Sequence, residues 1–177
     1  QDKFSNLGSA IVELGNNFAT TESEITEMSL RLAGAGTQIG LSQADIVGLA
    51  TALSSVGIEA EMGGSALSKA MVNMQVATQT GLDAMNQLEE QTGMSRRELE
   101  LLASNNSKGF KELAQSIGKT TDEINGTISA SKNLEGFADI AGMTAEEFKQ
   151  AFGKDATGAI AAFIQGLYPL CGRHRTL

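Results

Sequence analysis

Proline, cysteine, histidine and tryptophan are almost absent from this sequence. Its 177 residues include one Pro, one Cys, one His and no Trp, and only 5% are aromatic. A single cysteine, Cys171, cannot form an internal disulfide. The only histidine, His174, lies in the same terminal segment, so the rest of the chain offers neither paired His or Cys metal ligands nor a histidine base beside a nucleophile. We therefore expect no catalytic, cofactor-binding or metal-binding residues and no enzyme activity.

Basic residues and long apolar runs are also scarce. Thirteen Lys and Arg against 21 Asp and Glu give a formal net charge of −8. Because affinity for nucleic acids comes largely from clustered Lys and Arg, and the nearest cluster is Arg96-Arg97, we expect no specific nucleic-acid binding. No apolar run approaches the roughly 18 residues that span a bilayer, and no basic-then-apolar leader opens the chain. These features predict a soluble protein.

Glycine, in contrast, is abundant. Twenty glycines and a hydrophobic content of 41% accompany the low aromatic content. This composition favours helices packed through small residues over a β-sandwich, whose strands use more aromatic and β-branched residues. The length allows one or two domains with a sizeable core. We predict an all-α fold without a sheet.

One short pattern returns along the chain. "GLSQADI" (40–46), "GMSRREL" (93–99) and "GMTAEEF" (142–148) share it, and "GKTTDEI" (118–124) lacks only the apolar second residue. The hydroxyl residue can accept a bond from a free N–H of a helix's first turn, and the acid three residues later can accept one from the hydroxyl residue's own N–H. "TTESEI" (20–25) is a fifth such capping box, with Ala19 in the glycine position. The five predicted boxes are Thr21/Glu24, Ser42/Asp45, Ser95/Glu98, Thr120/Glu123 and Thr144/Glu147.

The residues around these caps predict that one helix ends where the next begins. The glycine two places before a cap can adopt the left-handed conformation that ends a helix. In three repeats, apolar residues flank the box and predict a hydrophobic staple: Leu41 with Ile46, Met94 with Leu99, and Met143 with Phe148. We interpret the repeat as architecture and not as a ligand site.

Apolar residues at helical spacing predict roughly eight to ten mostly short helices. Breaks are expected at Gly57, Gly63-Gly64 and near Gly153, while the stripe beyond Gly81 either continues the preceding helix or follows it. The expected stripes are Leu7, Ile11, Leu14, Phe18; Ile25, Met28, Leu32, Ile39; Ile46, Leu49, Leu53, Val56; Leu67, Met71, Met74; Leu82, Met85, Leu88; Leu99, Leu102; Phe110, Leu113, Ile117; Ile124, Ile128; Phe137, Ile140; and Phe148, Phe152, Ile160, Phe163, Ile164, Leu167. Core positions are predicted for Met71, Met74, Met85 and Met94, and solvated helix faces for Glu59, Glu61, Glu89, Glu90, Asp139 and Asp155.

The stretch "LSSVGIEAEMGGSALSKAM" (53–71) resembles the core region of phage tail tape measure proteins. Residues 11–58 and 137–167 are similar to the same family, so the resemblance covers about residues 5–167. It ends at Tyr168, where "YPLCGRHRTL" (168–177) turns basic and looks non-native. We expect one helical module over 1–167, or two subdomains (1–92 and 93–167), followed by this tail.

The resemblance implies a structural protein of a long-tailed bacteriophage or prophage. Such proteins lie in the tail lumen of the virion, after assembly in the host cytoplasm, where they set tail length and assist genome delivery. The implied partners are other tail proteins (tail tube, baseplate and tail chaperones) and further copies of the chain. No family catalytic residue maps onto this segment, and no membrane partner is expected.

Two other functional classes stay open from the residues alone. A peptidoglycan-cleaving, lysozyme-like tail enzyme would need an acid with a raised pKa in an apolar cleft, and its carboxylates can lie far apart in the chain. A membrane-active ejection segment would need a helix that is both strongly apolar and basic, and no segment combines these properties.

Overall fold

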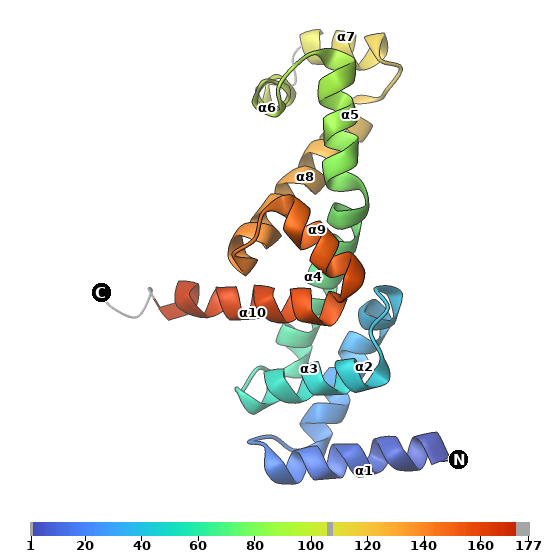
Figure 1. Ribbon diagram of the computed structural model, residues 1–177, viewed down its shortest axis with the longest axis vertical. Coiled ribbons are helices and arrows are strands. Elements are labelled where there is room, and N and C mark those ends of the chain that lie inside the picture. The colour runs from blue at the N-terminus through green and yellow to red at the C-terminus, as the bar shows by residue number, and fades with distance from the viewer. Residues whose placement is uncertain (1, 106–107, 173–177) are drawn as a thin grey trace. The chain divides into compact units, whose positions relative to one another are not determined.

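A computed structural model of the chain describes residues 2–105 and 108–172, with side chains for 5–105 and 108–167. The described residues form helices and turns without a strand, which confirms the all-α prediction (Figure 1). The elements are α1 Asp2–Asn17, α2 Glu22–Gln38, α3 Gln43–Ser55, η1 Ala60–Gly64, α4 Ser65–Val76, η2 Ala77–Gly81, α5 Leu82–Thr92, α6 Arg96–Ser104, α7 Lys108–Ser116, α8 Thr121–Ala141, α9 Ala145–Lys154 and α10 Ala156–Gly172; η1 and η2 are π-helical.

The chain forms two compact units, Gln1–Val72 and Asn73–Leu177. The boundary falls inside α4 and not at 92/93, where the sequence suggested a division. The physical reason is that α5 packs on η2 and α8, so the residues between 73 and 92 belong to the later helices. The backbone of α10 continues past Tyr168 to Gly172. The side chains of 168–172 and the whole of 173–177 lie outside the described residues.

Unit 1 is built on the pairing of α2 with α3, and η1 packs against α2. The predicted α2 stripe supplies the centre of its core, because Ile25, Met28 and Leu32 are fully buried. Gly64 of η1 lies against α2 so closely that an added Cβ would stand 2.9 Å from Cβ of Arg31. The absence of a side chain at Gly64 is therefore what lets η1 approach α2.

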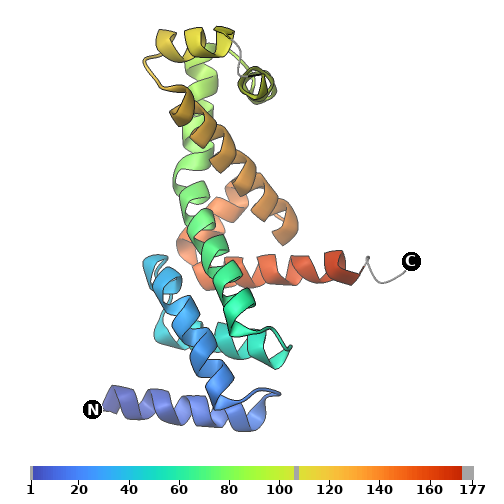
Figure 2. The same cartoon turned by 180° about the vertical axis from the view of Figure 1, so that it is seen from behind.

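Unit 2 is organised around α8, which contacts η2, α5, α6, α7, α9 and α10. In Figure 2, α8 (brown) runs beside the green helix of η2 and α5. The sequence predicted two short helices here, but α8 is one helix of 21 residues. Leu134, between the two predicted stripes, and Ala138 are both 1% exposed and continue its buried face.

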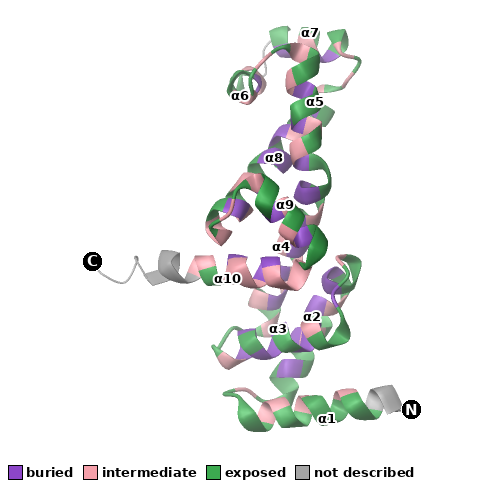
Figure 3. Ribbon diagram, viewed as in Figure 1, coloured by how far each residue is buried: buried purple, intermediate pink, exposed green. Residues whose placement is uncertain are grey.

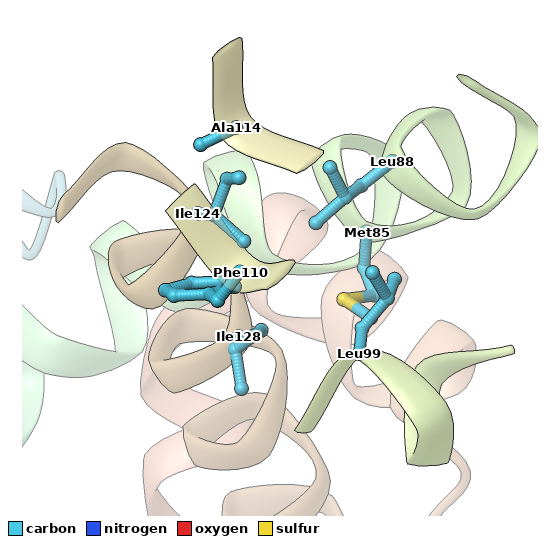
Figure 4. Packing of buried hydrophobic residues seen from close by; sticks show 7 residues of the cluster. All are labelled: Met85, Leu88, Leu99, Phe110, Ala114, Ile124 and Ile128. Atoms are coloured by element: carbon cyan, nitrogen blue, oxygen red, sulfur yellow. The ribbon is translucent and has the colours of Figure 1, made fainter. Parts of the chain in front are cut away.

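One core cluster of unit 2 joins four helices (Figure 4). Its buried residues are Met85 and Leu88 of α5, Leu99 of α6, Phe110 and Ala114 of α7, and Ile124 and Ile128 of α8. Met94 packs against it as a partly buried residue. Met71, Met74 and Met85 are fully buried, so these three methionines serve as core, as predicted.

The break predicted at Gly63-Gly64 is absent, and at Gly81 the helix continues, because the helical path runs from Ala60 to Thr92. Gly63-Gly64 lies in η1 and Gly81 in η2, so these glycines widen the helix instead of ending it. The break predicted near Gly153 falls at Asp155. Asp155 is not a residue of a solvated helix face: its Oδ1 accepts the N–H of Gly158 at 2.9 Å and caps α10.

The five predicted capping boxes are all formed. The acid's carboxylate accepts the backbone N–H of Ser42 at 2.9 Å, of Thr120 at 2.7 Å and of Thr144 at 2.8 Å. The same arrangement holds at Thr21 and Ser95, both at 2.8 Å.

The glycines before these caps adopt the predicted left-handed conformation, with φ between 65° and 87° at Gly40, Gly93, Gly118 and Gly142. At Gly40, the N–H of Leu41 donates to Gly36 O and the N–H of Gly40 donates to Thr37 O. This is the Schellman pattern, which satisfies the last carbonyls of α2. It recurs at Gly118 and Gly142, so these helix ends and the following helix starts form continuous junctions.

The predicted staple around Ser42 is also formed. Leu41 and Ile46 are buried and both reach the bare backbone of Gly36, where an added Cβ would meet Ile46 Cγ1 at 3.0 Å and Leu41 Cδ1 at 3.4 Å. Two stripe residues, in contrast, are exposed. Phe18 is 53% exposed and Val56 is 56% exposed, because each lies beyond the end of its helix.

The caps carry a stability prediction. Replacing Ser42 or Thr144 with Ala should lower the free energy of unfolding by about 0.5–2 kcal/mol each, because a first-turn N–H loses its acceptor. Thermal or urea unfolding checks this, with Ser23→Ala as the control at an exposed residue inside the first turn of α2. Unchanged unfolding of both cap variants would contradict the structural role of the repeat.

Candidate functional site

Four acids of the capping boxes have a shifted pKa. The pKa values of Glu24, Glu123 and Glu147 are lowered by hydrogen bonds from the cap residues Thr21, Thr120 and Thr144. The bond from the backbone N–H is the largest cause, and the bond from the side-chain hydroxyl is the second. The Ser95 hydroxyl and then its N–H lower the pKa of Glu98 in the same way. A lowered pKa keeps these carboxylates ionised at neutral pH, which is the opposite of what a general acid requires.

These pKa shifts give an expected pH dependence. A carboxyl whose pKa is lowered on folding stabilises the protein above its ordinary value of 4.5, and this stabilisation is lost as pH falls through the folded-state value. Between pH 6 and pH 3 the melting temperature of the parent should therefore fall more than that of a variant with Gln at 24, 98, 123 and 147. Gln can still accept the cap N–H bond, so this variant is expected to fold. Identical pH profiles would contradict the assignment.

The ion pairs of the described residues all lie in unit 2. Arg96 pairs with Glu135, Lys132 with Glu100 at 3.2 Å, Lys149 with Asp83 at 2.7 Å, and Lys108 with Glu112 at 3.6 Å. Glu89 also accepts the backbone N–H of Arg96 at 2.6 Å, so it is not merely a solvated face residue. Three of these contacts join neighbouring helices, whereas Lys108 and Glu112 lie one turn apart on the exposed face of α7. Each contact contributes little to stability.

Unit 1 contains an acidic hollow of about 340 Å³. Glu24 and Glu27 of α2, Glu59 just before η1 and Glu61 within η1 line it, together with Ser54 of α3. None of these four carboxylates forms an ion pair with another described side chain. The hollow therefore concentrates negative charge at the surface.

A second hollow of unit 1 is apolar and lies between α1 and α3. Leu7, Ala10 and Leu14 of α1 line one side, and Ala44, Val47 and Gly48 of α3 line the other. Its volume is about 470 Å³, with Asn6 and Gln43 as its polar lining residues. An adjoining hollow shares Ala10 and Leu14 and extends to Glu13, Asn17 and Phe18. We call these two hollows together the α1–α3 groove.

The α1 wall of this groove is incompletely covered. No described side chain of α1 is buried: Leu7, Ile11 and Leu14 are half-buried, and Val12 is 50% exposed. Figure 3 shows α1 in the colours of exposed and intermediate residues, while buried residues occur along α2 and α3. Sequence reasoning missed the groove because the stripe of α1 shows which face of the helix is apolar and not whether another helix covers that face. The available signal was the small residues Ala44 and Gly48 on α3.

The sequence predicted no catalytic, cofactor-binding or metal-binding residue, so there is no predicted site residue to locate in the structure. His174 and the side chain of Cys171 lie outside the described residues. Within 2–105 and 108–172, no group of three or more His, Cys, Asp or Glu side chains is placed to hold a metal ion. In the same residues, no helix is long and apolar enough to cross a membrane.

Comparisons with known proteins add no relative to this picture: no family model, no curated protein and no solved structure matches the chain.

Proposed function

We propose that this chain is a structural module of a phage tail tape measure protein, acting in tail assembly and genome delivery without catalysis. The resemblance of residues 5–167 suggests the family. The structural observation that supports the proposal is the series of junctions at Gly40, Gly93, Gly118 and Gly142, where a left-handed glycine ends one helix and a capping box starts the next.

These junctions favour a role in assembly or anchoring over a role in measuring length. A rod that measures length converts residue count into distance at about 1.5 Å per helical residue. A chain that ends its helices repeatedly and packs them into two compact units does not extend in proportion to its residue count. The module is therefore an assembly or anchoring part, attached to a longer rod that does the measuring. Its partners in this role are tail tube, baseplate and tail-chaperone proteins within the virion tail lumen.

Deletions in the full-length phage protein test this proposal. Removal of residues 40–80 should disrupt tail assembly or genome delivery without proportionate shortening of tails, because it removes α3, η1, α4 and most of η2, and with them packed parts of both units. Leu49→Pro should act in the same direction, because Pro in the interior of α3 costs about 3 kcal/mol or more. A rod deletion of equal length is the matched control and should shorten tails by about 1.5 Å per residue. Infectious phage with tails shortened in proportion to the 40–80 deletion would overturn the proposal.

A further inference from the structure

The α1–α3 groove is an apolar surface that the described chain leaves partly uncovered. Its lining alternates the larger side chains Leu7, Leu14 and Val47 with the small residues Ala10, Ala44 and Gly48. Gly48 has no heavy atom within 4 Å of the position where its Cβ would stand, so the groove is open above it. Two helices that flank an open apolar channel provide the geometry in which a third amphipathic helix packs.

One end of the groove is negatively charged. Glu13 lines it together with Asn17 and Phe18, and the carboxyl group of Glu22 lies beside Gly15, with Cδ 3.0 Å from the position of an added Cβ. The last turn of α1 carries no basic residue to offset its own C-terminal carbonyls. Neither Glu13 nor Glu22 forms an ion pair with another described side chain.

The same charge extends over unit 1. Residues 1–72 contain eight acidic residues and three basic ones, Lys3, Arg31 and Lys69. A second copy of the chain docked through this groove would bring two such surfaces together, and like charges at an interface oppose association. A basic partner would instead gain both apolar burial and charge complementarity.

We infer that the α1–α3 groove docks an amphipathic helix of another protein, with apolar residues at helical spacing and Lys or Arg near the end that meets Glu13. The apolar face of this helix covers Leu7, Leu14 and Val47, and its basic residues lie beside Glu13 and Glu22. This inference rests on the groove and its charge and does not depend on the proposed tail function.

Titration of the full chain with a labelled 18-residue helical peptide of Leu and Lys, followed by fluorescence anisotropy, tests the inference. We expect saturable binding with one peptide per chain. Gly48→Leu should weaken binding at least tenfold, because its Cβ has open space and the rest of the side chain would occupy the groove. Gly34→Leu is the matched control, because Gly34 is also an exposed helical glycine of unit 1 with open space at its Cβ but lies outside the groove. The affinity of this variant for the peptide should stay within twofold of that of the parent.

Two further comparisons separate the inferred site from general attraction to an acidic protein. Glu13→Lys should weaken binding at least threefold, whereas Glu90→Lys in α5, with the same change in net charge, should have less than half that effect. A peptide with Glu in place of Lys should bind at least tenfold more weakly. Circular dichroism checks that each variant folds, and Ala44→Leu repeats the groove-filling test at a neighbouring exposed position of α3 if Gly48→Leu does not fold.

Several outcomes would overturn the inference: no saturable binding, equal weakening by the Gly48 and Gly34 variants, or equal affinity for the Leu/Lys and Leu/Glu peptides. Light scattering that shows a dimer of the parent and a monomer of Gly48→Leu would make a second copy the occupant and would also overturn it. Because none of these measurements involves tail length, their failure is distinguishable from failure of the tail proposal.

Discussion

Gly166→Ala is expected to lower the free energy of unfolding of unit 2 by about 3 kcal/mol. Gly166 of α10 lies directly against the backbone of Ile140 near the end of α8, and an added Cβ would overlap the carbonyl oxygen of that residue. Backbone atoms cannot turn aside as a flexible side chain can, so α10 must move away from α8. Gly81→Ala is expected to act in the same direction, since its Cβ would stand 2.8 Å from Ala130 O. Urea unfolding of the purified chain measures both effects.

Two glycines of α8 provide matched controls for these variants. Gly126 and Gly136 are exposed, and nothing lies within 4 Å of their Cβ positions. Ala at either position should stabilise the protein by about 0.4–1 kcal/mol, because it reduces the freedom of the unfolded chain and favours the helix. If all four substitutions stabilised the protein equally, the close approaches at Gly81 and Gly166 would be wrong.

Phe148→Ala is expected to destabilise unit 2 by about 3–5 kcal/mol. Phe148 is fully buried between α8, α9 and α10. Its ring centroid lies 6.3 Å from that of Phe137 and 6.1 Å from that of Phe152, in stacked arrangements. Phe137 in turn packs edge-on against Phe163 of α10. Truncation therefore leaves a cavity among three helices, and chemical unfolding should report the loss.

The control for this truncation is Phe18→Ala, at a phenylalanine that is 53% exposed beyond the end of α1. Its effect on stability should be within about 0.5 kcal/mol, because little apolar surface is withdrawn from water there. Equal destabilisation by the two truncations would show that the cluster around Phe148 is not the core of unit 2.

Local motifs were the most predictable part of the structure. The capping boxes at Thr21, Ser42, Ser95, Thr120 and Thr144 are formed as predicted. Each involves residues no more than three positions apart, so its donors and acceptors meet whenever the helix begins there. The same reasoning explains the left-handed glycines, whose conformation is set by the end of the preceding helix.

Glycines inside helices were predicted less well, because a glycine alone does not show whether a helix ends or is closely approached. Gly63 and Gly64 were expected to break a helix, and at Gly81 the sequence allowed either a continued helix or a new one, yet the helical path continues through all three. Gly64 meets α2 and Gly81 meets the backbone of α8, so distant contacts stabilise a widened helix at both places. Asp155 shows the converse: it starts a helix without an acid three residues later, so no capping box marked it.

The sequence by itself determined the all-α class, the five helix starts at capping boxes and the buried stripes of α2 and α9, because these depend on interactions within a few residues and on a 3.6-residue period. Only the tertiary structure decided which stripes become core, where the two units divide and where a surface is left open. The stripe of α1 has the same spacing as that of α2, but no described side chain of α1 is buried. Periodicity specifies which face of a helix is apolar, whereas burial depends on whether other helices cover that face. In unit 1, α3 covers α2 and leaves the groove beside α1 open.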